Sequence, residues 1–376
     1  MAKSAVGIIF SSLNNKTLSR LTSDRTVAAI PFACRYRLVD FALSNMVNAN
    51  ISNINIVANY NYRSLQEHIG SGKDWDLARR RSGINFISPF QTAVGAEAKM
   101  FSTHMEALKS MKEYIDEFSE EFVVLSDSDT VLNIDLSRVI EYHEKSGCDI
   151  TMVTKTIDAA FSSKHPRMLI SSQDGKIVDI ALGQSYNGKQ NELALGIFVM
   201  KTLYLKKIIE EAEAYNLNSF TSLLLRNSGI YDLRAYNFTG YVASVSSFLD
   251  YYKCSIELAK NEDARESLLW KKDFPVFTRV NNSSPTKFTE TATVKSSMIA
   301  DDCVIEGTVI NSVISRGVRV EKGAVVKNSV LFKGTRVGRG ASLNCIVCDI
   351  NVDVSENIVL SGNDNMPFYI QKGRKV

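Results

Sequence analysis

The chain has 376 residues, of which 45% are hydrophobic and 23% charged, the composition of an ordinary globular protein with room for two domains. A formal net charge of +3 and the absence of any apolar run near the roughly 20 residues of a membrane span give no reason to expect a nucleic-acid or membrane partner. Six scattered cysteines and an N-terminus without a secretory pattern indicate reduced thiols and a cytoplasmic location.

The first predicted element is a buried strand over residues 6–10, where the chain reads VGIIF. Nucleotide-binding α/β proteins often follow such a strand with a glycine-rich turn, because glycine lets backbone N–H groups approach phosphate closely. Here residues 11–17 read SSLNNKT and contain no glycine. The turn by itself leaves open whether a nucleotide site is built differently here or has been lost.

Up to about residue 255, short β-branched apolar runs alternate with amphipathic stretches. The runs have the length of buried parallel strands, and the stretches repeat apolar residues at helical spacing. This alternation predicts an α/β sheet with helices on both faces and with ligands beyond the C-terminal ends of its strands, after residue 10 and after Leu125. The predicted strands are 53–59, 121–127, 149–155 and 194–200, and the predicted helices lie within 41–50 and 100–118.

From about residue 286, an aliphatic residue recurs at about every sixth position, and a glycine often follows three residues later. This is the hexapeptide pattern of a parallel β-helix, in which each coil stacks its aliphatic residue on the next. Cys345 and Cys348 have the spacing of a metal-binding pair, but no second Cys or His pair accompanies them, so we expect two half-buried thiols in a strand. The aliphatic positions are Ile314, Val320, Val326, Leu331, Val337 and Leu343.

One long stretch closely resembles a known family. Residues 24–77, from DRTVAAIPF to GSGKDWDL, resemble the N-terminal domain of bacterial glucose-1-phosphate adenylyltransferase, and the blocks at 194–200, 241–258 and 277–288 follow in family order. The resemblance implies a nucleotidyltransferase fold, Rossmann-like with a mixed, mostly parallel sheet, followed by a left-handed parallel β-helix. The family forms tetramers and joins ATP to glucose 1-phosphate with magnesium, giving ADP-glucose and pyrophosphate.

The resemblance also sets the expected domain boundaries. We predict a nucleotidyltransferase-like domain over 1–255, a connecting helix and linker over 256–285, and the β-helix over 286–376.

The chain departs from the family where the family binds phosphate. Catalytic members carry G-G-x-G-x-R after the first strand, and here the three glycine places are Ser12, Leu13 and Asn15, while the arginine place is Thr17. A phosphate-facing lysine of the family corresponds to Val27. The new side chains prevent backbone N–H groups from approaching a triphosphate, and the positive charges that would face it are gone. The resemblance therefore implies a lost triphosphate site.

The metal and sugar positions differ as well. The family's sugar-gripping Glu-Lys-Pro element falls on residues 181–184, which read ALGQ, and one of its two magnesium carboxylates falls on Ser244. The other carboxylate aligns with Ser128 or Asp129, depending on the side from which the turn is counted. We therefore expect no catalytic residue, cofactor or metal ion in this chain, with Asp127 and Asp129 as vestigial candidates.

The motifs that support the family fold are intact, at Tyr36, Asp40, Asn45 and Gly196, and Gly196 marks a vestigial sugar-phosphate cleft. A chain that keeps its fold and sheds its chemistry is similar to the regulatory D-type subunit of the family, a non-catalytic component of glycogen biosynthesis. The resemblance implies a heterotetramer with a catalytic subunit that holds ATP and Mg²⁺, and a homo-oligomer when the chain is alone.

Two other activities remain open. A weakly active adenylyltransferase requires that Asp129 hold the metal and that Lys16 supply the missing positive charge. A sensor that binds a sugar phosphate or nucleotide without reacting requires only an open cleft. A hexapeptide acyltransferase is set aside, because such enzymes use a histidine base in the β-helix and no histidine follows His165.

Basic residues suggest one regulatory site. In the family, arginines near residue 25 and a basic C-terminal segment hold an anionic regulator, and the matching candidates are Arg25, Arg35 and Arg37, with the tail QKGRKV at residues 371–376. The competing interpretation is a set of solvated charges plus one structural ion pair from Arg37 to Asp40.

Overall fold

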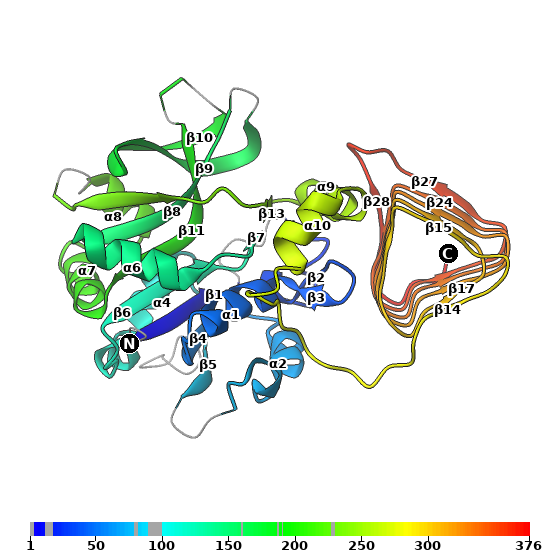
Figure 1. Cartoon of the computed structure of the whole chain (residues 1–376), viewed down its shortest axis with the longest axis horizontal. Helices are drawn as coiled ribbons and strands as arrows, with labels where there is room; N and C mark the ends of the chain where they lie inside the picture. Colours follow the sequence, from blue (N-terminus) through cyan, green and yellow to red (C-terminus); the bar gives the residue numbers. More distant parts are fainter. Residues whose placement is uncertain are drawn as a thin grey trace.

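A computed structural model describes residues 4–11, 18–78, 82–88, 100–158, 161–185, 188–189, 191–226 and 230–376. Figure 1 shows an α/β domain and a triangular β-helix, joined by two helices and an extended linker. None of the helices in the described residues is long and apolar enough to cross a membrane. The helices are α1 (Leu38–Asn48), α2 (Arg63–Ile69), α4 (His104–Ser110), α5 (Lys112–Asp116), α6 (Leu136–Ser146), α7 (Thr202–Ala214), α8 (Phe220–Arg226), α9 (Phe248–Lys260) and α10 (Glu262–Leu269).

Among the described residues, the α/β domain contains a nine-stranded sheet with the order β5-β4-β1-β6-β11-β8-β12-β10-β9. Two short pairs, β2 with β3 and β7 with β13, lie beside it. The strands of the large sheet are β1 (Ala5–Phe10), β4 (Asn53–Val57), β5 (Gly83–Ile87), β6 (Phe122–Asp127), β8 (Ile150–Thr156), β9 (Ser162–Gln173), β10 (Lys176–Ser185), β11 (Glu192–Lys201) and β12 (Leu233–Asn237). The paired short strands are β2 (Pro31–Phe32), β3 (Tyr36–Arg37), β7 (Thr130–Leu132) and β13 (Val242–Ser244).

The sheet is mixed and mostly parallel. Strands β5, β4, β1 and β6 run parallel to one another, and β12 runs parallel to β8. Strand β11 is antiparallel to both of its neighbours β6 and β8, so the expectation that residues 194–200 form a parallel strand is wrong. An uninterrupted apolar run indicates that both faces of a strand are buried, but it does not indicate the direction of the strand.

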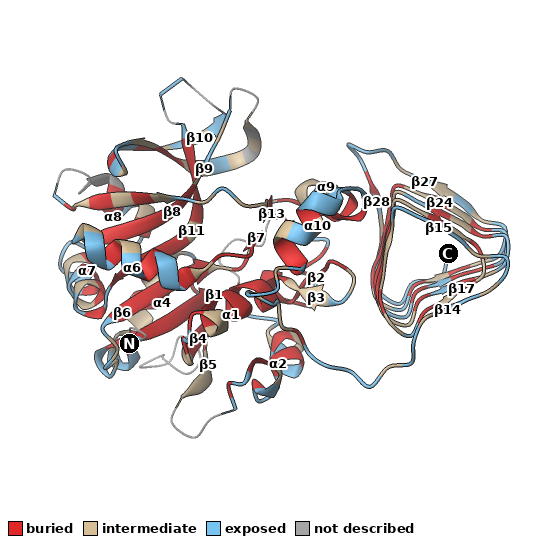
Figure 2. Ribbon diagram, in the orientation of Figure 1, coloured by how far each residue is buried: buried red, intermediate tan, exposed pale blue. Residues whose placement is uncertain are grey.

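Helices cover both faces of the sheet, as the sequence predicts. On β1, Val6 and Ile8 pack into the core under α4, α5, α7 and α8, whereas Ile9 packs into the core under α1, α2 and α6. The alternation follows from the two-residue period of a strand, which sends successive side chains to opposite faces. Figure 2 shows the resulting buried sheet between helices whose outer faces are exposed.

The C-terminal domain is a parallel β-helix with three five-stranded sheets. The six aliphatic positions predicted from the hexapeptide pattern are all fully buried, which confirms the coil register. The expectation of two half-buried thiols in a strand is wrong: Cys348 ends β25 and is buried in this core, and Cys345 is buried in the cluster at the domain junction, one residue before the strand begins. The strands are β14 (Lys287–Phe288), β17 (Val304–Ile305), β20 (Arg319–Val320), β23 (Arg336–Val337) and β26 (Asp353–Val354) in one sheet, β15 (Thr293–Lys295), β18 (Thr308–Ile310), β21 (Val325–Lys327), β24 (Ser342–Asn344) and β27 (Val359–Ser361) in the second, and β16 (Met298–Ile299), β19 (Val313–Ile314), β22 (Val330–Leu331), β25 (Ile346–Cys348) and β28 (Phe368–Ile370) in the third.

The two domains share a hydrophobic core at their junction. Helix α9 contacts β19 and β22, and Val313 and Val330 of these strands belong to the same buried cluster as Tyr251 and Tyr252 of α9. The Tyr252 hydroxyl donates a hydrogen bond of 2.8 Å to the Asn328 carbonyl of the β-helix. The predicted domain boundary at residue 255 falls inside α9, several of whose side chains belong to the buried cluster at the junction.

The C-terminal residues run along the last coil. The backbone N–H of Asp353 donates to the Arg374 carbonyl at 2.9 Å, and the N–H of Ser355 donates to the Val376 carbonyl at 2.7 Å. The N–H of Val376 returns a bond of 3.0 Å to the Asp353 carbonyl. Residues 374–376 thus occupy the edge of the β-helix sheet that ends with β26.

Candidate functional site

A cavity of about 520 Å³ opens at the C-terminal ends of the central strands. Phe10 ends β1 and Asp127 ends β6, and the two residues are in register, so the parallel pairing itself brings them to one wall. Gly196 of β11 and Val27 also line the cavity. The position agrees with the prediction that ligands bind beyond the ends of parallel strands.

Asp127 is engaged by a histidine. Its Oδ1 lies 2.6 Å from Nε2 of His104, the first residue of α4, and the His104 ring packs edge-on against Phe10 with ring centroids 4.5 Å apart. Burial lowers the pKa of His104, but the adjacent Asp127 carboxylate outweighs burial and raises the pKa above its ordinary value. The Asp127 carboxylate therefore favours the protonated form of the His104 ring.

Gly196 is required by this arrangement. Its φ of +72° lies in the left-handed region, and a Cβ there would lie 2.5 Å from Oδ2 of Asp127. The regular pairing of β11 with β8 is interrupted between Ala194 and Phe198 at the same point. Gly196 lines the cavity, where the sequence analysis placed the vestigial sugar-phosphate cleft. The side-chain group nearest to it is the Asp127 carboxylate.

Ser128 and Asp129, the two residues that could align with the family's first metal carboxylate, have different surroundings. The Ser128 hydroxyl is buried and donates a hydrogen bond of 2.9 Å to the Phe10 carbonyl. Asp129 lies beside the short β7–β13 pair, where Ser244 is opposite Thr130 and the Val245 N–H donates to the Asp129 carbonyl at 2.7 Å. The chain thus brings Ser244 next to Asp129, as the two carboxylate positions of a metal site require. Burial, and then the negative charge of Asp127, raise the pKa of Asp129.

An arginine occupies the space beside Ser244. Nη1 of Arg167, from β9, donates a hydrogen bond of 2.6 Å to the Ser244 Oγ and a second bond to the Ser246 Oγ. Arg167 and Ser246 both line the cavity. Sequence analysis missed Arg167 and His104: strand β9 was not predicted, and His104 lies inside the predicted helical stretch 100–118 without any pattern that marks it.

The residues present do not fit a magnesium ion. Magnesium takes oxygen ligands in near-octahedral geometry, usually with one or two carboxylates that carry no competing cation. Here Asp127 is paired with His104, and Arg167 is bound to the hydroxyl of the second metal position. No group of three or more His, Cys, Asp or Glu side chains suited to a metal occurs within the described part of the chain.

Other predicted positions lie partly outside the described residues. The altered phosphate turn, with Ser12, Leu13, Asn15, Lys16 and Thr17, falls in the segment 12–17 that the structure does not describe. The sugar-gripping segment lies on β10, and its Leu182 lines the cavity with an exposed apolar side chain. The described lining is thus apolar at Val27, the place of the family's phosphate-facing lysine, and at Leu182, within the segment that aligns with the sugar-gripping element.

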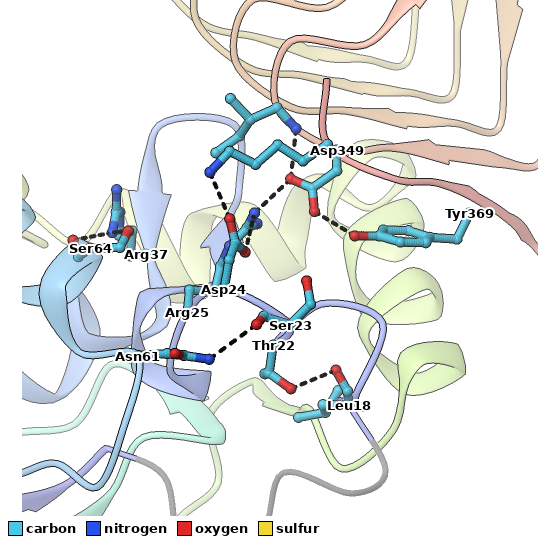
Figure 3. A network of polar contacts seen from close by, with 12 residues as sticks. Leu18, Thr22, Ser23, Asp24, Arg25, Arg37, Asn61, Ser64, Asp349 and Tyr369 are labelled. Carbon is cyan, nitrogen blue, oxygen red and sulfur yellow. Dashed lines mark hydrogen bonds and ion pairs between the residues drawn. The ribbon is translucent and has the colours of Figure 1, made fainter. Parts of the chain in front are cut away.

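Arg25 is buried in a network between the two domains, shown in Figure 3. Its Nη2 lies 2.8 Å from Oδ1 of Asp349 in the β-helix, and the Asp24 carboxylate lies 3.0 Å away on the other side. The Asp349 carboxylate also accepts a hydrogen bond from Tyr369, and Lys372 of the tail binds Asp24 at 2.6 Å. Two carboxylates of the chain itself therefore face this guanidinium.

The other two arginine candidates make separate contacts. The Arg37 guanidinium donates to the Ser64 carbonyl at 2.7 Å and to the Ser64 hydroxyl at 2.9 Å (Figure 3). The expected ion pair from Arg37 to Asp40 is wrong: Asp40 accepts the Arg37 backbone N–H at 3.0 Å and pairs with His68 at 2.6 Å. Asp40 caps the first turn of α1, where a carboxylate satisfies a free N–H. Arg35 stacks against Tyr36.

Comparison with known proteins identifies the family. A family model described as nucleotidyl transferase matches residues 6–217, and one described as GlmU-like C-terminal hexapeptide matches residues 284–367. The chain is 34% identical over 372 residues to the glycogen biosynthesis protein GlgD of Bacillus subtilis (strain 168), which covers 98% of this chain and 96% of that protein. The chain belongs to the bacterial glucose-1-phosphate adenylyltransferase family.

Further relatives in the family include GlgD of Geobacillus stearothermophilus, 32% identical over 99% of this chain and 97% of that protein. The glucose-1-phosphate adenylyltransferase of Clostridium perfringens (strain SM101 / Type A) is 29% identical over 86% of this chain and 83% of that enzyme. These matches confirm the predicted fold: a nucleotidyltransferase domain followed by a left-handed β-helix of hexapeptide repeats.

Proposed function

We propose that this chain takes part in glycogen biosynthesis as a non-catalytic, regulatory subunit of glucose-1-phosphate adenylyltransferase. The observation that carries the proposal is the state of its cavity. The cavity keeps its place in the fold, but its lining has a hydroxyl at Ser244 in place of a metal carboxylate and an apolar side chain at Val27 in place of a cation. An active site for phosphoryl chemistry needs both kinds of charge.

The similarity to relatives supports the same role. Two of the matching proteins are called glycogen biosynthesis proteins, and others are called glucose-1-phosphate adenylyltransferases. The chain retains the family fold along nearly its whole length, including the β-helix and the apolar junction between domains. A chain that serves in assembly alone can keep these features while its cavity loses the groups that bind phosphate and metal.

A non-catalytic subunit can still raise the activity of a partner. If it binds the competent conformation of a catalytic subunit more tightly than the incompetent one, it shifts the population toward the competent state. A coupling free energy of about 1–3 kcal/mol corresponds to an increase of roughly 5- to 150-fold in an equilibrium constant. The effect on the partner appears as higher turnover, tighter use of substrate or an altered response to a regulator.

The test is reconstitution with the catalytic subunit from the same cell. The isolated chain is expected to make negligible ADP-glucose from ATP, glucose 1-phosphate and Mg²⁺, and the mixture is expected to co-purify as a hetero-oligomer with changed kinetics. Robust synthesis by the isolated chain would contradict the proposal and favour the weakly active enzyme. Failure to co-purify, together with unchanged kinetics on mixing, would contradict the partner role.

The volume of the cavity favours a second candidate function, a sensor of a sugar phosphate or nucleotide. About 520 Å³ lies within the range of small-molecule sites. Calorimetric titration of the isolated chain with glucose 1-phosphate and with ATP, each with and without Mg²⁺, separates the two functions. Saturable binding without turnover supports the sensor, and no binding of either compound leaves a purely architectural subunit.

A further inference from the structure

Arg167 lines the cavity together with Ser246. Arg167 lies on β9 opposite Gly183 of β10, and its Nη1 reaches Ser244 at 2.6 Å and also binds Ser246. The two serines come from β13 and from the turn that follows it. One guanidinium therefore bridges the outer hairpin of the sheet and the short β7–β13 pair.

The same end of the cavity holds the carboxylates. Ser244 lies opposite Thr130, the residue after Asp129, so the bridge is fixed beside Asp129, and the Arg167 charge attracts this carboxylate. Asp127, the other carboxylate of the cavity, is paired with His104 at 2.6 Å. Of the two described carboxylates in the lining, Asp127 is thus paired with a basic side chain, and Asp129 is attracted by the charge of Arg167.

We propose that the Arg167 guanidinium takes the place of a divalent cation in this cavity and excludes metal ions from it. The guanidinium carries a permanent positive charge and is held in place by the Ser244 and Ser246 hydroxyls, so it attracts the Asp129 carboxylate without needing the oxygen ligands that a metal ion needs. A divalent ion brought to Asp129 would meet this positive charge and would find the Ser244 and Ser246 hydroxyls already engaged. Arg167 therefore determines the charge of the ligands that the cavity accepts, because it disfavours cations.

The proposal predicts that a carboxylate at position 244 is insufficient for metal binding. In Ser244→Asp, the new carboxylate lies within reach of Arg167 and pairs with it. In the double variant Arg167→Gln/Ser244→Asp, the new carboxylate and Asp129 face each other without a fixed cation, which is the arrangement that a divalent ion stabilises.

The experiment uses Mn²⁺ as the probe and the full-length chain as the protein. Binding is measured by the loss of the electron paramagnetic resonance signal of free Mn²⁺ in the wild type, Ser244→Asp and the double variant. We expect the double variant to bind Mn²⁺ at least about tenfold more tightly than Ser244→Asp, because the like charge is removed. Thermal melting of each variant establishes that it is folded.

Two controls separate charge from shape. Arg167→Lys combined with Ser244→Asp keeps the positive charge and is expected to exclude Mn²⁺ as Ser244→Asp does. Arg63→Gln combined with Ser244→Asp removes a positive charge from α2, where the Arg63 side chain is 91% exposed, and is expected to change nothing.

The proposal is overturned if Ser244→Asp alone binds Mn²⁺ as tightly as the double variant. It is also overturned if the wild type binds Mn²⁺ in a way that Asp129→Asn abolishes, or if the folded double variant binds no Mn²⁺. The outcomes with Ser244→Asp and with the double variant leave the proposed regulatory role standing. Mn²⁺ bound to Asp129 in the wild type would also favour the weakly active enzyme, and assaying the isolated chain for ADP-glucose synthesis would then decide between the two roles.

Discussion

Arg25 and Asp349 lie 324 positions apart in sequence and form a buried ion pair of 2.8 Å between the two domains. Their side chains are 2% and 1% exposed, so water does not replace either partner when the other is removed. We expect Asp349→Ala to lower the free energy of unfolding by about 3–5 kcal/mol, because it leaves Arg25 with only the partly exposed Asp24. Denaturant or thermal unfolding measures the loss.

The matched control is Lys372→Ala in the same network. The Lys372 and Asp24 side chains are 53% and 35% exposed, so removing this ion pair is expected to cost less than about 1 kcal/mol. Equal losses for Asp349→Ala and Lys372→Ala would contradict the assignment of the buried pair as the stabilising contact.

His143 gives a pH dependence of stability. It is buried on α6, where its Nδ1 lies 2.9 Å from the Thr151 hydroxyl, and burial lowers its pKa to about 4. Between pH 4 and the ordinary pKa of about 6.5, the unfolded chain binds the proton and the folded chain does not, so stability falls as the pH falls. From pH 7 to pH 5 this contribution amounts to about 2 kcal/mol.

The measurement compares thermal melting of the wild type and His143→Gln from pH 7 to pH 5. Glutamine keeps a polar group near Thr151 but does not titrate, so the variant is expected to lose less stability than the wild type over this interval. Parallel losses in the two proteins would show that His143 is protonated in the folded chain as readily as in the unfolded one.

Contacts between residues that are far apart in the sequence could not be predicted from the sequence. Arg25 was identified as a basic side chain of interest, but its partner Asp349 is separated from it by most of the chain and becomes its neighbour only when the domains pack. The contact of Arg167 with Ser244 arises in the same way. Spacing in sequence predicts neighbours within an element, and partners from different elements are set by the packing of the whole fold.

Among the elements, the coils of the β-helix give the sharpest test of register. On β21, Val326 points into the core and is fully buried, whereas its neighbour Val325 is half-buried on the outer face. We expect Val326→Asp to unfold the β-helix or lower its free energy of unfolding by more than about 4 kcal/mol, because an unpaired charge enters an apolar core.

Val325→Asp is the control, because it makes the same substitution one residue away on the same strand. The outward position keeps the carboxylate in contact with water, so a loss below about 1.5 kcal/mol is expected. Melting curves and the oligomeric state of both variants check the comparison. A Val326→Asp protein with a normal melting temperature would show that the coil register is wrong.

An element can be predicted from the sequence when the residues that determine it are close together in the sequence. The β-helix follows from a six-residue period that every coil repeats, so its inward residues were predictable one by one. The direction of β11 depends on its pairing with β6 and β8, which an apolar run does not encode. The β9–β10 hairpin, which carries Arg167, has mixed polar and apolar residues and was not predicted at all.

At the scale of the whole molecule, the cavity depends on several segments acting together. Ser244→Asp restores one carboxylate but leaves Val27 in the lining and Arg167 across the site. Groups that stabilise a transition state act as a unit, so this single change is expected to give no detectable ADP-glucose synthesis. A pyrophosphate-release assay measures it, and a large burst from this one variant would show that the remaining machinery is intact.

The tail along β26 has a consequence for self-association. The edge strand of a sheet displays unpaired N–H and C=O groups, on which the sheet of a second molecule can add. In this chain, the backbone of residues 374–376 already bonds to Asp353 and Ser355 at that edge. Deleting these three residues is expected to leave the melting temperature nearly unchanged and to increase self-association through the exposed β26 edge. The measurement is light scattering per molecule as the protein concentration rises. An increase in the deletion variant, with none in Lys375→Ala, would show that residues 374–376 block pairing at the β26 edge.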